Sequence, residues 1–376
     1  MRRTTTILLF ASILAACQKE AEEKAASSVD APVTIGVAAT PHEDVTVTRA
    51  AYTVTEPDVS NPLSAYVWAS SESANYSNCT HCFTTFYSAY SVLDKSGTRA
   101  VQYAVSGAST PEMYFVGLSP ASDDGTVGND VWSLSDNKAT YTFNGADDVM
   151  YAPEVHSHYT GDVPVLHFYH VLTHLRFIIR CEGDDADSRE EVSYAWGKLK
   201  NIRLIKQNNF TDDPKNTVTV SLSPVATSLT QVLARSTFSS TADYLSLFKA
   251  GTVGTYFPQN YGAADNSNLW YTLPTDEEGE EAAYMLCAPV TATYQTGGSL
   301  TDEYTLELNT EKRSNVKVGI DLKTGTNSYF SGSTMGCEFL VTLTFRFGKV
   351  IAVATAMHDW EGNGGQTIQG IGEEDD

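Results

Sequence analysis

Positive charge is scarce in this chain of 376 residues, which carries 24 Lys and Arg side chains against 46 Asp and Glu, a formal net charge of −22 at pH 7. A protein with a pI near 4.6 repels a phosphate backbone, so the charge balance argues against nucleic-acid binding. Long apolar runs are missing too. Beyond a short stretch at the N-terminus, no window approaches the roughly 20 apolar residues of a membrane-spanning helix.

Recognisable catalytic patterns are also missing. The sequence has no nucleophile elbow, and neither a helix-forming run nor a Lys-Ser/Thr pair follows the Gly-rich stretch 362–365, so that stretch is not a phosphate-binding loop. Acidic pairs such as Asp147-Asp148 sit in turn-rich stretches, and we expect them to be solvated loops. We therefore expect no enzyme activity, no catalytic residue and no cofactor.

The sequence is rich in residues that form strands. Hydrophobic residues make up 42% and aromatic residues 11%, while charged residues are only 19%. Short β-branched and aromatic runs, such as 33–38 and 339–347, alternate with turn clusters, and Gly348-Lys349 fits a tight hairpin. The best helix candidate is 240–251. Many short strands with almost no helix predict an all-β chain of two β-sandwiches in series.

The N-terminus has the parts of a bacterial export signal. A positive start is followed by a short apolar core at 7–14. Leu14-Ala15-Ala16-Cys17 then resembles the lipobox, which implies cleavage before the cysteine and attachment of a diacylglyceryl group and a further acyl chain such as palmitate. Several acyl chains on one residue give durable anchoring. The alternative is an ordinary secretory signal with an incidental cysteine.

These features divide the chain into four parts. Residues 1–16 are predicted to be the lipoprotein signal peptide, with Cys17 as the lipidation site. Residues 17–32 are polar and poor in aromatics, and we expect an acidic tether. A polar, acidic break at 182–187 then predicts a boundary between an N-terminal β-sandwich, 33–183, and a C-terminal β-sandwich, 184–376, which ends in a short strand.

Two clusters in the sequence contain cysteine and histidine, the residue types that often bind metals. Cys79-Thr80-His81-Cys82 has no second cysteine pair, so we interpret it as a local disulfide or two free thiols. The pairing of the other cysteines cannot be assigned from the sequence. Five histidines fall within 156–174, but no consistent carboxylate or cysteine pattern accompanies them, so we expect satisfied or exposed histidines and no metal site.

Several segments resemble fimbrillin-like proteins, the FimA/Mfa-like or type V pilin superfamily. The resemblance covers most of the chain after residue 32, and each motif is degenerate, but their order together with the lipobox is fairly specific. The segments that carry it are Thr48-Arg49-Ala50, Asp147-Asp148-Val149-Met150-Tyr151-Ala152, Val165-Leu166-His167-Phe168-Tyr169-His170-Val171-Leu172-Thr173-His174-Leu175-Arg176-Phe177, Tyr256-Phe257-Pro258-Gln259 and His358-Asp359-Trp360-Glu361-Gly362. The family fold is two transthyretin-like β-sandwiches, which agrees with the strand pattern.

The resemblance implies a mechanism of assembly. In this family a surface lipoprotein precursor is cut after an arginine by an Arg-specific protease, and the first strand is released. The open groove then takes a strand from a neighbouring subunit. On this chain the cut would fall between Arg49 and Ala50. The alternative is that Arg49 is an exposed basic residue with no such role.

The C-terminal segment departs from the family pattern. Its strand-forming part, 366–371, is interrupted by Gly370, which favours an accessory, tip or anchor subunit over a polymerising stalk. The resemblance thus implies a fimbrial subunit on the outer membrane surface, which associates with other fimbrial subunits and serves adhesion to a host or bacterial surface ligand. The alternative is a surface glycan-binding lipoprotein of a nutrient-uptake system, with exposed aromatics stacking on sugars: Trp68, Trp132, Trp196 or Trp270.

Overall fold

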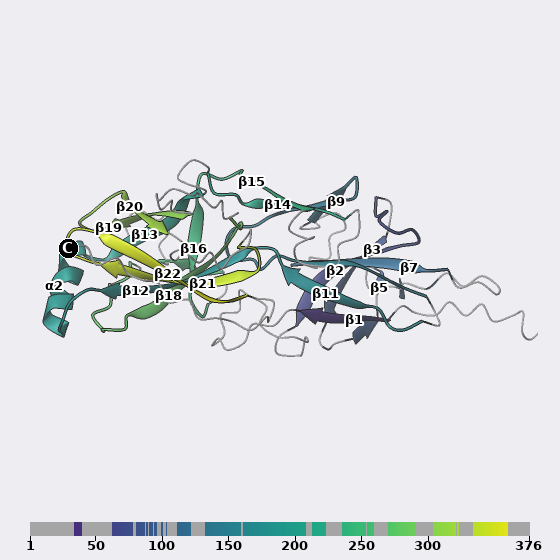
Figure 1. Cartoon of the computed structure of the whole chain (residues 1–376), viewed down its shortest axis with the longest axis horizontal. Coiled ribbons are helices and arrows are strands. Elements are labelled where there is room, and N and C mark those ends of the chain that lie inside the picture. Colours follow the sequence, from purple (N-terminus) through teal and green to yellow (C-terminus); the bar gives the residue numbers. More distant parts are fainter. Residues whose placement is uncertain are drawn as a thin grey trace, which may run out of the picture.

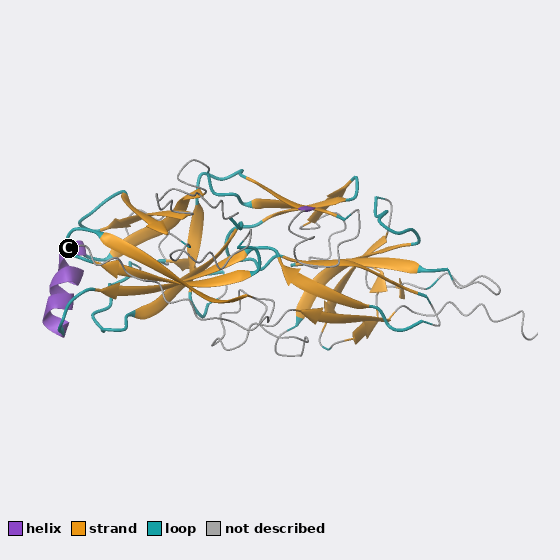
Figure 2. Ribbon diagram, in the orientation of Figure 1, coloured by secondary structure: helices purple, strands orange, loops and turns teal. Residues whose placement is uncertain are grey.

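Strands make up almost all of the regular structure in the computed structural model of this chain (Figure 1). Figure 2 shows the same dominance of strands, with helix α2 at one end of an elongated molecule. The fold class predicted from the sequence, all-β, is therefore confirmed. The structure describes residues 34–39, 62–77, 80–86, 88, 90–92, 94–95, 99–100, 103, 111–121, 132–158, 161–207, 213–222, 235–252, 254–258, 270–290, 304–320, 322 and 334–359.

A seven-stranded sheet lies in the right half of the molecule in Figure 1, in the order β3-β2-β7-β10-β11-β1-β4. Its strands are β1 (Thr34–Ala39), β2 (Leu63–Ser70), β3 (Thr80–Phe86), β4 (Tyr90–Val92), β7 (Met113–Ser119), β10 (Met150–Ser157) and β11 (Val165–His170). The sheet is mixed, because β1 runs parallel to β11 while the other pairs are antiparallel. Two short strands, β5 (Asp94–Lys95) and β6 (Arg99–Ala100), pair separately.

A nine-stranded sheet lies in the left half of Figure 1, in the order β20-β19-β13-β16-β18-β12-β21-β22, with β17 paired to β16. Its strands are β12 (Thr173–Cys181), β13 (Leu199–Gln207), β16 (Leu245–Lys249), β17 (Tyr256–Phe257), β18 (Glu280–Cys287), β19 (Tyr304–Thr310), β20 (Val316–Ile320), β21 (Cys337–Phe345) and β22 (Val350–Asp359). The two edge strands β20 and β22 contact each other, which shows that the sheet curves round on itself. The predicted hairpin at Gly348-Lys349 is confirmed by the antiparallel pairing of β21 with β22.

A four-stranded sheet ties early and late parts of the chain together. Its order is β15-β14-β9-β8, with β8 (Trp132–Ser135), β9 (Lys138–Thr142), β14 (Thr217–Ser221) and β15 (Ser236–Ser239). The central pair joins β9 to β14, and hydroxyl contacts follow the pairing: the Thr140 and Thr219 Oγ1 atoms are 2.9 Å apart. This sheet packs its apolar face, including Trp132 and Val218, into the core that also holds Trp68.

Strand β2 of the seven-stranded sheet is buried on both faces. Tyr66 and Trp68 of β2 point into the larger core of the molecule. Ala65 and Val67 of the same strand point into a second, smaller core. Alternate residues of a strand face opposite sides of a sheet, so this division follows directly from the period of two. Burial on both faces explains why β2 reads as a nearly continuous apolar run.

The helix expected at 240–251 is a strand, and that prediction was wrong. Leu245, Ser246, Leu247 and Phe248 are all buried, because β16 lies inside the nine-stranded sheet between β13 and β18. A strand buried on both faces loses its polar–apolar alternation, so the spacing of its apolar residues matched a helix by coincidence.

A helix instead follows the acidic break. Helix α2 (Ala186–Trp196) begins after Asp185, whose side chain accepts a hydrogen bond from the Ser188 backbone N–H at 2.8 Å. The Ser188 hydroxyl contacts the Asp185 N–H in return, which completes a capping box. Hydrogen bonds to the capping carboxylate lower the pKa of Asp185. Within the described residues, no helix is long and apolar enough to cross a membrane.

Strand pairing crosses the predicted boundary between residues 183 and 184. The chain passes from β11 of one sheet to β12 of the other at Val171 and Leu172, ahead of that boundary. Strand β12 then pairs with β18 and with β21, which both come from the later segment. Independent folding of 33–183 and 184–376 stays a prediction.

Gly117 of β7 gives a direct test of the packing inside the smaller core. A Cβ atom at this position would lie 2.5 Å from Phe168 Cζ and 3.2 Å from Ala152 Cβ. We expect Gly117→Ala to lower the free energy of unfolding by about 1–3 kcal/mol through overpacking. Gly348→Ala is the matched control, because a Cβ there meets no atom within 4 Å. Equal melting temperatures for the two variants in thermal unfolding would contradict this packing.

Candidate functional site

The first strand of the described chain, β1, is built into the interior of a sheet. Its second half, Gly36 to Ala39, pairs in parallel with residues 165–168 of β11. Its first half, Thr34 to Gly36, pairs antiparallel with β4 on the other side. The strand predicted at 33–38 is thus confirmed, and each half of it is hydrogen-bonded to a different neighbour.

Ile35 anchors β1 in the smaller core. Its side chain is fully buried there. The register aligns Val37 with Leu166 and Ala39 with Phe168 of β11, and both β11 side chains belong to the same core. The apolar partners of Ile35 in this core come from five other strands and include Val67, Phe86, Phe115, Met150 and Phe168.

Loss of β1 would leave two strands incomplete. In the order of the sheet, β4 joins the other described strands only through β1, and β11 would become an edge. Unpaired N–H and C=O groups on a sheet edge attract another strand. The apolar surface left by Ile35 would add an unfavourable free energy of about 25 cal/mol per Å² exposed. Loss of β1 would therefore leave a gap between β4 and β11, with unpaired backbone groups on both sides.

The predicted modification sites lie outside the described residues. These are the lipidation site Cys17 and the processing site Arg49-Ala50. Cys79 of the CxxC motif also lies outside them, so its pairing stays a prediction. The structure brings none of these positions to a described contact.

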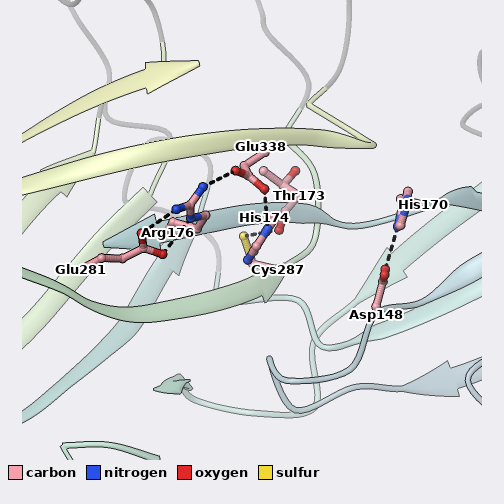
Figure 3. Close-up of polar contacts among 8 residues, drawn as sticks. All are labelled: Asp148, His170, Thr173, His174, Arg176, Glu281, Cys287 and Glu338. Atoms are coloured by element: carbon pink, nitrogen blue, oxygen red, sulfur yellow. Dashed lines mark hydrogen bonds and ion pairs between the residues drawn. The ribbon is translucent and has the colours of Figure 1, made fainter. Parts of the chain in front are cut away.

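A buried polar network surrounds the passage between the two large sheets (Figure 3). His170 Nδ1 lies 2.9 Å from Asp148 Oδ1, and His174 Nδ1 lies 2.8 Å from Glu338 Oε2. All four side chains are buried. These carboxylates come from distant segments, so no local sequence pattern pairs them with the histidines. Among the described residues no three potential ligands gather in a metal-binding arrangement.

Arg176 extends this network along β12. Its Nη1 donates to Glu338 at 2.9 Å, and its Nε donates to Glu281 at 2.8 Å. Burial alone would lower the pKa of Arg176, but hydrogen bonds to these two carboxylates outweigh it and raise the pKa above its ordinary value. Glu338 therefore receives hydrogen bonds or charge contacts from two side chains of one strand, which fixes β21 against β12.

Hydroxyl and thiol groups fill the rest of the passage. The Thr173 hydroxyl contacts Thr334 Oγ1 at 2.7 Å, and the Cys287 thiol faces the Thr173 carbonyl oxygen at 3.7 Å. Burial raises the pKa of Cys287 to about 12 and that of Cys181 to about 11. Both residues are thiols in the structure, and such pKa values keep them protonated and unreactive.

The acidic pair Asp147-Asp148 is not a solvated loop, and that expectation was wrong. Asp148 is buried and contacts His170. Burial raises the pKa of Asp147, although a hydrogen bond with Tyr141 opposes the shift. The pair lies just before β10, in a segment whose neighbouring residues Ala146 and Val149 belong to the larger core.

The aromatic platform of the glycan-binding alternative does not form. Trp68, Trp132 and Trp196 are fully buried, so three of the four proposed stacking residues cannot reach a sugar. Trp270 is half-buried, and Lys200 Nζ lies 4.5 Å from its ring centroid. Large aromatic residues in a β-rich chain fill cores more often than they bind ligands, and here they do so.

Comparison with known proteins gives structural neighbours alone. No family model and no curated protein matches the chain. A "putative cell adhesion protein" from Bacteroides uniformis is similar at TM-score 0.47 and 13% identity, over 89% of this chain and 100% of that one. A fimbrial protein from Bacteroides vulgatus is similar at TM-score 0.41 and 12% identity, over 87% and 99%. The tip fimbrial protein Mfa3 from Porphyromonas gingivalis is similar at TM-score 0.35 and 10% identity, over 86% and 98%.

The names of these neighbours are those of fimbrial and cell-adhesion proteins, the class that the sequence resemblance implies. Their TM-scores are below 0.5, so the similarity by itself does not establish a shared function.

The two carboxylates that contact Arg176 differ in burial. Glu338 is 1% exposed and contacts both Arg176 and His174, whereas Glu281 is 31% exposed. Removing one partner of a buried ion pair leaves an uncompensated charge. We expect Glu338→Gln to lower the free energy of unfolding by about 3 kcal/mol. Glu281→Gln, the matched control, should cost about 1 kcal/mol or less. Urea unfolding measures both, and equal losses would contradict the assigned burial.

Proposed function

We propose that this chain is a cell-surface fimbrial subunit of the accessory, tip or anchor kind, which assembles by protease-triggered strand exchange and serves adhesion. The observation that carries the proposal is the position of β1: the first described strand lies inside a sheet, between β11 and β4. Arg49 follows the end of β1 by ten residues. A cut there separates β1 from the rest of the chain while its hydrogen bonds still hold it in place.

The partners in this proposal are those that the family resemblance implies. An Arg-specific protease cuts after Arg49, and another fimbrial subunit supplies the strand that replaces β1. The lipid on Cys17 anchors the precursor to the outer membrane until it is cut. The accessory role rests on the short C-terminal strand 366–371, which Gly370 interrupts. The glycan-binding alternative is disfavoured, because three of its four stacking residues, Trp68, Trp132 and Trp196, are buried.

Limited digestion with trypsin tests the cut. We expect a new N-terminus at Ala50 and a shift towards oligomers, because loss of β1 exposes apolar surface and sheet edges. Arg49→Ala should block both effects, while Arg99→Ala should leave them unchanged. N-terminal sequencing and size-exclusion chromatography read the two outcomes.

Arg189 provides an internal reference for this digestion. Its side chain is buried in α2, and its Nε donates to the Thr275 carbonyl oxygen at 2.6 Å. Trypsin should therefore spare Arg189 while the protein stays folded. Two outcomes would refute strand exchange in this chain. One is cleavage of the wild type only at sites other than Arg49, and the other is a stable monomer after cleavage at Arg49.

Membrane anchoring has its own test. If Cys17 carries the lipid, Cys17→Ala should move the protein from the membrane fraction to the soluble fraction, because the acyl chains supply the anchor. Fractionation without detergent, followed by immunoblotting, measures the change. Wild-type protein in the soluble fraction would disprove lipid anchoring, and Cys181→Ala, at a buried thiol, serves as the control substitution.

A further inference from the structure

The end of the molecule that carries α2 displays the two most exposed large apolar side chains among the described residues. Tyr194 of α2 is 78% exposed, and Phe347, in the turn between β21 and β22, is 56% exposed. The turn after β19 connects them, since Lys312 Nζ lies over the Tyr194 ring and Arg313 Nη2 donates to the Phe347 carbonyl oxygen at 2.5 Å. The two aromatic side chains therefore border one continuous surface.

Four cationic side chains gather on this surface of a strongly acidic protein, beside the carboxylates of Glu182 and Glu311. We call it the cationic pole, defined by Lys312, Arg313, Arg346 and Lys349. One of its four cations is neutralised, because Arg346 pairs with Glu182 at 2.9 Å. Within the described parts of the chain, the other three form no ion pair with a carboxylate. Cations without a carboxylate partner in the described residues, beside exposed aromatic rings, suit a ligand that is apolar in one part and anionic in the next.

The contacts within the pole hold its cations in position. Arg313 stacks over the Trp196 ring, with Cζ 4.1 Å from the ring centroid, and its guanidinium also donates to the carbonyl oxygens of Phe347 and Gly348. Trp196 Nε1 donates to the Arg346 carbonyl oxygen at 2.7 Å. The β21–β22 turn is thus fixed against α2, and the binding surface exists before any ligand arrives.

The chain itself contains a segment of matching chemistry. Residues 366–371 include Ile368 and Ile371, and Glu373, Glu374, Asp375 and Asp376 follow directly. We call residues 373–376 the acidic tail. We infer that the acidic tail binds the cationic pole of its own molecule, with the preceding apolar residues placed against Phe347.

The length of the intervening chain permits this contact. Strand β22 starts next to the pole, at Val350, and ends at Asp359 after a length of ten residues. A strand of that length spans about 33 Å. Glu373 follows Asp359 by 14 residues, which in extended form reach about 46–50 Å. The chain beyond β22 can therefore return along the whole strand and place its carboxylates at the pole.

Zero-length carbodiimide crosslinking of the full chain tests this contact, because it joins only carboxylates and amines that touch. An equal mixture of ¹⁵N-labelled and unlabelled protein shows by mass spectrometry whether each crosslink lies within one molecule. We expect intramolecular crosslinks from the acidic tail to Lys312 or Lys349. In about 1 M NaCl the Debye length falls to about 3 Å, so these crosslinks should drop roughly fivefold or more.

Other lysines and a pair of variants give the controls. Lys138 and Lys249 are exposed on distant strands and should crosslink to the acidic tail no more than background. Arg313→Gln should reduce the tail crosslinks severalfold, whereas Arg313→Lys, which keeps the charge, should retain them. No tail crosslinks, an even spread over Lys138 and Lys249, or crosslinks only between differently labelled molecules would each overturn the inference.

Docking of the tail has a consequence that rests on the proposed function. A docked tail keeps residues 366–371 on their own molecule, away from the sheet of a neighbour. Neutralising the tail with E373Q, E374Q, D375N and D376N should then speed oligomer formation severalfold after cleavage at Arg49. The crosslinking readout needs no oligomer, so failure of strand exchange and failure of tail docking give different results.

Discussion

Residues 165–181 form a nearly continuous extended run that belongs to two sheets. This run sets the position of the seven-stranded sheet relative to the nine-stranded sheet. Its first portion, β11, flanks β1 in the seven-stranded sheet, and its second portion, β12, lies deep in the nine-stranded sheet. Only Val171 and Leu172 separate them, and both are fully buried. A segment buried on all sides cannot bend freely, so the two sheets keep a fixed relation and the elongated shape of Figure 1 results.

The buried charges of this passage lose favourable hydration, but their contacts also restrict how the strands pair. A fully apolar passage would bury the same area without desolvating Glu338, Arg176 and two histidines, and buried ion pairs are seldom the more stable choice. Their geometry instead restricts pairing: Glu338 meets His174 and Arg176 only when β21 lies in its observed parallel register with β12. A shift of one residue would move the carboxylate to the opposite face of the sheet. The network therefore favours the observed register.

Composition and turn spacing were sufficient to predict the all-β fold, the strand at the N-terminus and the last hairpin, because each depends on local pattern. The helix prediction at 240–251 failed, since β16 is buried on both faces and its neighbours come from residues 203–204 and 283–284. The histidine partners were missed for a similar reason. Glu338 lies 164 residues from His174, and no spacing rule connects them. The Asp185 cap of α2 was readable from its Ser188 partner, but the acidic run around it favoured a linker.

The dual pairing of β1 has a kinetic consequence. Strand β4 runs antiparallel to β1, and β1 runs parallel to β11, so β4 and β11 have opposite directions and are compatible as direct neighbours. If β1 departs, β4 can close on β11 and remove the vacancy from within, without any other molecule. In the proposed strand exchange, an incoming strand must therefore arrive before that closure or displace β4 afterwards. The three residues of β4 make the internal closure weak, which leaves the vacancy open to a longer competitor.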